Sequence, residues 1–169
     1  MGADLSGEDH HDADLRRANL SGAIVKETNF SSANLERANM SGIVATGATF
    51  DDANMEQVNL AGANIVEATF HSTNLQGANM SGSRAQNASF ADANLEEANL
   101  TGASLQQASF SSANLEDANL AGANIADAHF PDTNLEDANF SNAIATNAYF
   151  GGAHLEDTTF IATNLEGAS

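Results

Sequence analysis

Eight carboxylates of this 169-residue chain recur at intervals of twenty residues, in two adjacent series. The first series is Glu96, Glu116, Glu136 and Glu156, and the second is Glu97, Asp117, Asp137 and Asp157. A chain that repeats its conformation every twenty residues would align them as one acidic edge. Such an edge attracts a protein partner with a basic surface, or divalent cations that bridge neighbouring carboxylates. The alternative is that exposed acids only keep a β-rich rod soluble.

A second group of ligand-type residues is the segment Glu8-Asp9-His10-His11-Asp12. Imidazole and carboxylate groups suit divalent metals, but adjacent residues project in different directions, so their spacing is poor for one shared ion. Glu8 and His10 also replace the residue types used at equivalent positions elsewhere. We therefore predict an irregular first coil around residues 8–12, and no metal site.

Catalytic chemistry is poorly represented in the sequence. The absence of Cys excludes disulfides, thiolate catalysis and Cys-ligated metals. There is no Gly-rich phosphate loop, and no Ser, His and Asp lie in a plausible register for a triad. We predict that the protein is not an enzyme and holds no cofactor.

The backbone structure that positions these acids can be predicted from the apolar residues, which repeat every five positions. All 14 Leu and all 9 Phe lie at positions divisible by five, and the residue two positions earlier is usually Ala. On an α-helix, five residues rotate a side chain by about 500°, which scatters the apolar residues around the surface. On a flat strand, an odd period alternates the two faces. Only a chain that turns a corner in each pentad keeps every fifth residue inside.

A longer period of twenty gives the number of sides. Phe recurs every twenty residues from Phe30 to Phe150, and a small residue followed by Gly recurs from Ser21-Gly22 to Ala121-Gly122. Four pentads per turn make a square cross-section, and residues n and n+20 should stack at about 4.8 Å. The chain from Ala3 to Ala168 then forms about eight coils.

These residues carry a family resemblance. The motif A(D/N)LXX, as in Ala33-Asn34-Leu35 and Ala93-Asn94-Leu95, repeats throughout the chain and resembles the pentapeptide-repeat family. The resemblance implies an all-β fold, a right-handed quadrilateral β-helix. We expect one such domain over residues 1–169, without helical caps.

Charge and hydropathy limit the partners. The chain carries 23 Asp+Glu against 5 Lys+Arg, a net charge of −18, so it lacks the basic footprint of a direct nucleic-acid binder. No apolar run is long enough for a membrane span, and no signal-peptide core follows Met1. We expect a cytoplasmic protein without membrane contact. The periplasm or thylakoid lumen is the alternative if a leader was removed.

Two further surfaces suggest contacts. Ile24 and Val44 lie one coil apart at outward positions, which indicates either local repacking or an exposed apolar spot for a partner. The repeats run from Ala3 to Ala168 without a capping segment, and open coils leave unpaired backbone groups. We therefore expect self-association through uncapped ends.

Three functions fit the sequence. The first is a non-enzymatic structural or protein-interaction rod of unknown specific role. The second follows from the resemblance, because some pentapeptide-repeat proteins mimic DNA and bind DNA gyrase, a type II topoisomerase. Twelve acids lie beyond residue 85, over roughly 20 Å, close to the charge density of B-DNA. However, the C-terminal helical module typical of those proteins is missing here. The third is a head-to-tail self-assembling scaffold, with the less acidic N-terminal end against the acidic C-terminal end.

Overall fold

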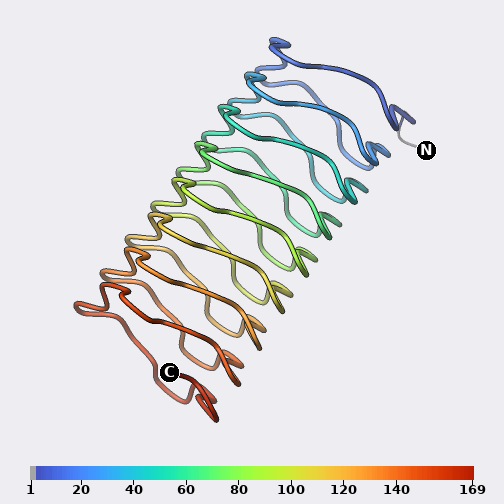
Figure 1. The fold of residues 1–169 in the computed structure, drawn as a ribbon. Helices are drawn as coiled ribbons and strands as arrows, with labels where there is room; N and C mark the ends of the chain where they lie inside the picture. Colours follow the sequence, from blue (N-terminus) through green and yellow to red (C-terminus); the bar gives the residue numbers. More distant parts are fainter. Residues whose placement is uncertain (1–2) are drawn as a thin grey trace.

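Residues 3–169 form one continuous rectangular coil in the computed structural model (Figure 1). Residues 1 and 2 of the predicted 1–169 solenoid lie outside the described residues. The chain advances by one coil every twenty residues, and the blue and red ends lie at opposite ends of the rod. Residues 3–169 contain no helix, and the fold is the predicted all-β, right-handed quadrilateral β-helix.

Each coil has four short faces, which in the first coil are residues 3–5, 8–10, 13–15 and 18–20. The middle residue of each face forms a parallel bridge with the residue twenty positions later, from Asp4 with Ile24 to Ile144 with Asn164. There are 29 such bridges, and no longer strand forms within residues 3–169, because a corner follows every bridge. The backbone therefore fixes the register at twenty residues throughout.

The corners are two-residue turns. The carbonyl of the inward residue accepts the N–H three residues later, as between Leu35 and Ala38 at 2.9 Å. The second corner residue has a positive φ, such as 57° at Arg37 and 63° at Gly42. Glycine adopts this conformation without strain, which explains the recurrent small residue and Gly. Many corners nevertheless hold Asp, Asn, Glu or Ser, and their side chains point into solvent.

The interior is a set of stacked columns. The Phe rings from Phe30 to Phe130 stack with centroids 4.8–5.2 Å apart and planes within 10° of parallel. Phe140 meets Phe130 edge-on at 6.0 Å, where the neighbouring Leu and Met column becomes aromatic. Each of these rings is fully buried. Complete burial of such a side chain contributes roughly 1.5–3 kcal/mol.

Some Ala positions hold hydroxyl residues, and most of these are paired. Thr28, Thr73 and Thr133 are buried there, and each hydroxyl donates to a carbonyl oxygen 23 residues earlier at 2.7–2.8 Å. Ser83 occupies the same kind of position, but its buried Oγ has no partner among the described residues. Ser83 is thus a weak point among the hydroxyl residues at the Ala positions.

The first coil corrects one prediction. The irregular coil expected around residues 8–12 is wrong for the backbone, because Asp9 bridges Asn29 and the His10 N–H donates to the Asn29 carbonyl at 2.7 Å. The His10 ring stacks on Phe30 at 5.4 Å, and its Nε2 lies 3.0 Å from a Glu8 carboxylate oxygen. A polar pair therefore fills these two positions without breaking the coil.

The Phe column yields the first prediction. Phe90→Ala leaves a cavity between Phe70 and Phe110, and we expect the free energy of unfolding to fall by about 3–5 kcal/mol. Asp92→Asn, at an exposed corner, should change it by less than about 0.5 kcal/mol. Urea titration followed by circular dichroism measures both. A loss below about 1 kcal/mol in the Phe90 variant would contradict the stacked core.

Candidate interaction edge

The eight predicted carboxylates lie together on one corner, as expected. They occupy the two turn residues between the third and fourth faces, in four successive coils. The first turn residue, as in Glu116, is partly buried, and the second, as in Asp117, is exposed with a φ of 58°. The structure therefore forms an acidic edge of two carboxylates per coil.

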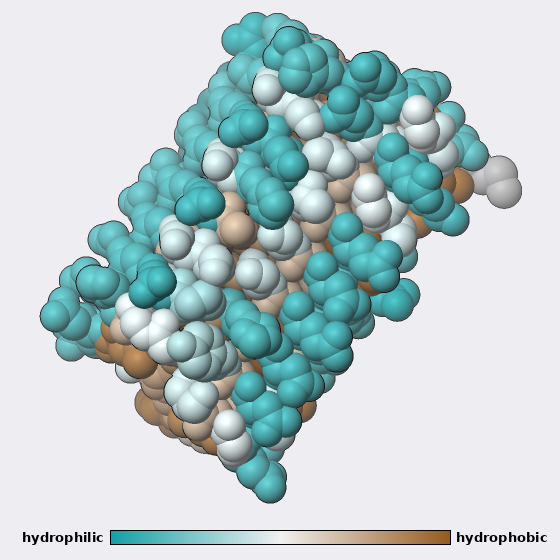
Figure 2. Space-filling model, viewed as in Figure 1, coloured by the Kyte–Doolittle hydropathy of each residue, from teal (hydrophilic) through white to brown (hydrophobic). Residues whose placement is uncertain are grey.

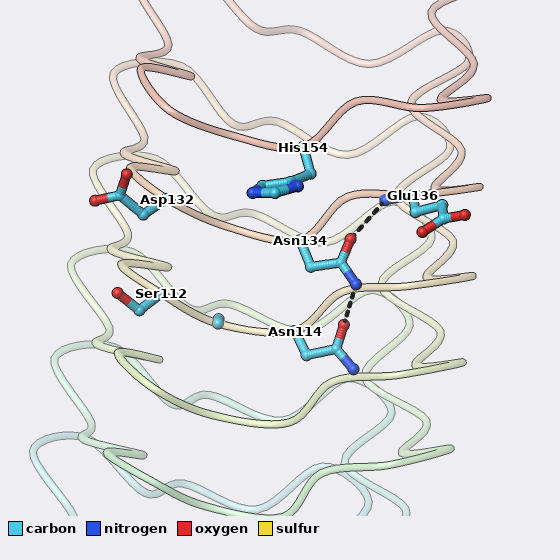
Figure 3. Close-up of a pocket in the computed structure, with 7 residues that line it drawn as sticks. Ser112, Asn114, Asp132, Asn134, Glu136 and His154 are labelled. Carbon is cyan, nitrogen blue, oxygen red and sulfur yellow. Dashed lines mark hydrogen bonds between the residues drawn. The ribbon is translucent and has the colours of Figure 1, made fainter.

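Asparagine side chains hold this edge in place. The Asn134 Oδ1 accepts the Glu136 N–H at 3.1 Å, and its Nδ2 donates to the Asn114 Oδ1 at 3.0 Å (Figure 3). The same Nδ2 also lies 3.3 Å from a Glu116 carboxylate oxygen. Equivalent bonds from Asn94 and Asn114 fix the backbone of Glu96 and Glu116. We call Asn94, Asn114 and Asn134 the Asn ladder. It ties the turns of Glu96, Glu116 and Glu136 to their own coils, and Asn114 and Asn134 also bond to the coil before.

The position of Glu136 within the edge perturbs its ionisation. Partial burial raises the pKa of Glu136 above its usual range, and the neighbouring charges raise it further. In decreasing order, those charges are on Glu116, Glu156, Asp137 and Asp157. Burial and like-charge neighbours both disfavour ionisation, so Glu136 is an electrostatically strained position of the acidic edge at neutral pH.

A shallow depression lies beside this edge on the third face (Figure 3). Asp132 borders it on one corner, Glu136 on the other, and His154 continues the Asn ladder above Asn134. Within residues 3–169, no three His, Asp or Glu side chains gather as metal ligands, either here or in the segment of residues 8–12. The depression is open and polar.

The N-terminal end of this same corner carries arginines, which we did not predict from the sequence. We call residues 16 and 17, with their equivalents every twenty residues, the 16/17 edge. Its first two coils carry Arg16, Arg17 and Arg37, and its last four carry the acidic edge. The spacing of twenty residues already placed these arginines on the same corner as the acids. Counting charge along the chain, without regard to corners, concealed that alignment.

The arginines are partly compensated. Arg16 makes two bonds to the Asp14 carboxylate, at 2.8 and 2.7 Å. This hydrogen bonding lowers the pKa of Asp14 to about 2 and raises the pKa of Arg16. The Arg37 Nε donates to Gln57 at 2.9 Å, and Arg17 forms no ion pair with any residue in 3–169. A second depression is lined here by Asp14, Arg16, Arg17 and Glu36.

The predicted apolar spot lies on another face. Ile24 and Val44 are bridged to each other on the first face, and both are only partly exposed. A partner role for them stays a prediction. In Figure 2, brown surface gathers at the lower end of the rod, the end of the C-terminal coils. Leu155, Ile161 and Leu165 are 40–70% exposed there. Self-association through the ends also stays a prediction.

Comparison with known families decides the family. The profile for pentapeptide repeats (8 copies) matches residues 2–31, 13–52, 46–82 and 63–102, and the profile for a pentapeptide repeat region matches residues 83–160. The chain belongs to the pentapeptide-repeat family. The family resemblance inferred from A(D/N)LXX is therefore confirmed.

Solved structures of the family share the fold. HetL, a pentapeptide repeat protein involved in heterocyst differentiation regulation in the cyanobacterium Nostoc, is 27% identical with a TM-score of 0.73. The alignment covers 99% of this chain and 78% of HetL. A trypsin-treated variant of QnrB1, a plasmid-mediated fluoroquinolone resistance protein, is 21% identical with a TM-score of 0.53, covering 94% of this chain and 90% of QnrB1. The second likeness shows the fold alone.

Two further findings complete the comparison. No curated protein matches the chain. Across residues 3–169, no helix has the length and apolarity needed to cross a membrane.

The strain at Glu136 gives the second prediction. Because the folded state raises this pKa, the ionised Glu136 destabilises the fold above that pKa, and the penalty disappears as the pH falls below the unfolded-state value. Glu136→Gln should therefore raise the melting temperature at pH 7 and lose this advantage near pH 4. Thermal melts at both pH values test it. An unchanged advantage at low pH would contradict the electrostatic origin.

Proposed function

We propose that this protein is a non-enzymatic interaction rod whose acidic edge binds a basic surface of a protein partner. The observation that carries the proposal is the alignment of eight carboxylates along one corner over four coils. Two charges per coil of about 4.8 Å give one charge per about 2.4 Å. A surface with lysines or arginines in a row of about 15–20 Å would match this edge.

The architecture supports a binding role over a catalytic one. The interior is filled with buried side chains, and the two depressions described above are shallow, polar and open. The Asn ladder holds the acidic turns rigidly, so little conformational entropy is lost when a partner docks. HetL, which has a related rod, takes part in a regulatory process, and this supports a regulatory interaction role here.

A second candidate partner is DNA gyrase, with the acidic edge in place of a DNA backbone. The charge spacing of about 2.4 Å lies between that of one strand of B-DNA, about 3.4 Å, and that of the duplex, about 1.7 Å. This density favours a protein that normally binds DNA as the basic partner. The charges follow one straight corner rather than a groove, so the match is to a single phosphate row.

The third prediction tests the acidic edge with an octalysine peptide. E96Q/E116Q/E136Q/E156Q should weaken peptide binding by roughly tenfold at low salt, because it halves the charge of the edge. Glutamine fits these turns, since Gln76 occupies an equivalent one. Fluorescence anisotropy of a labelled peptide measures the affinity.

The matched control changes four acids on other corners, D12N/D52N/D92N/D127N. It removes the same net charge, and asparagine readily adopts the positive φ of these four turns. We expect near wild-type peptide binding from this control. Equal weakening in both variants would mean that net charge, and not the acidic edge, determines binding.

The fourth prediction concerns gyrase. The wild-type protein at micromolar concentration should inhibit DNA supercoiling by gyrase, and the E96Q/E116Q/E136Q/E156Q variant should not. The D12N/D52N/D92N/D127N control should inhibit like the wild type. Gel analysis of plasmid topoisomers reads this out. If the wild-type protein leaves supercoiling unchanged, the gyrase candidate fails while the general proposal stands.

A further inference from the structure

The 16/17 edge changes sign along its length. Its first coil carries two positive charges, at Arg16 and Arg17, and its second carries Glu36 with Arg37. The third coil has a single acid, Glu56, the fourth is uncharged, and the last four coils carry two carboxylates each. Because the backbone bridges hold every coil in the same register, these charges lie on one straight line.

Such a line complements itself only in one orientation. If two copies lie side by side in the same direction, every coil faces its equivalent, and the acidic edges meet each other along four coils. If one copy is reversed, the arginine coils of each copy face the last acidic coils of the other. Charge complementarity therefore strongly favours the antiparallel arrangement.

We propose that two copies of this chain pair antiparallel along the 16/17 edge, as a closed two-fold dimer. In this register Arg17 of each copy lies opposite Asp157 of the other, and Arg37 lies opposite Asp137. A two-fold axis makes each contact occur twice, so four arginine–aspartate contacts form per dimer.

The middle of the edge tolerates this approach. The uncharged coil of Gln76 and Gly77 faces Glu96 and Glu97, so that no like charges meet there. Two like-charge contacts remain in this register, Glu36 opposite Glu136 and Glu56 opposite Glu116. The guanidinium of Arg37 lies beside the first and the amide of Gln57 beside the second, and both groups are donors. Exposed ion pairs contribute little individually, and the net charge of −18 opposes association, so the dimer should be weak and sensitive to salt.

Two double variants and their combination test the pairing. R17E/R37E and D137R/D157R each place like charges at the proposed contacts, and R17E/R37E/D137R/D157R restores opposite charges with the natural net charge. Glutamate fits both turns, because Glu67 and Glu97 occupy equivalent turns with positive φ, and Arg17 and Arg37 show that arginine does too. Circular dichroism of each variant is the check that the fold is kept.

Sedimentation equilibrium at about 0.5 mM protein and low salt measures the mass. We expect dimers for the wild type, and roughly tenfold or greater weakening in each double variant. The quadruple variant should dimerise again, and so should an equimolar mixture of the two double variants. Species larger than a dimer should not form, since the pairing is closed.

Three outcomes would overturn the pairing. One is a wild-type protein that remains monomeric, and another is a quadruple variant that does so. The third is stronger association of D137R/D157R than of the wild type, which net charge alone would produce, since that variant is less negative. None of these measurements uses a basic partner, so their failure is distinguishable from failure of the proposed function.

Discussion

The stacking of each residue on the residue twenty positions later is the constraint on which the rest of this structure depends. The bridges from Asp4–Ile24 to Ile144–Asn164 are backbone contacts, so they impose the same register on every side chain whatever its type. A residue choice repeated every twenty positions therefore becomes a continuous column. Inside the rod these columns are the hydrophobic core, and outside it they are continuous edges such as the acidic edge.

The same stacking has opposite energetic effects inside and outside. For the Phe column, a spacing near 4.9 Å brings aromatic faces into contact and excludes water. For the acidic edge, that spacing brings carboxylates together, and the pKa of Glu136 is raised first by its partial burial and then by these neighbouring charges. The Asn ladder bonds the acidic turns to the coils, as Asn134 does for Glu136, so the repulsion does not open the corner.

The sequence predicted the columns because residue type and position both repeat: Phe90 lies inside and Glu116 lies on the edge, as the two periods require. It did not predict the regular first coil, because side-chain patterning at Glu8 and His10 says little about backbone bridges that any residue can form. The handedness came from family resemblance rather than from spacing. The arginines of the 16/17 edge were missed for another reason, since charge counted along the chain ignores which corner each residue occupies.

In the first described coil, polar residues replace core residues. Glu8 and His10 stand at positions that hold Ala and Phe in most other coils. His10 keeps a planar ring on Phe30, so the stacking contact of the Phe column continues, while its Nε2 approaches the Glu8 carboxylate. Glu8 in turn stands where an interior coil needs Ala, and it fits because no earlier coil packs on it within the described residues. The last coils make no such replacement, and Leu155 and Leu165 remain apolar and exposed. The two ends of the rod are thus chemically different, although the backbone that builds them is the same.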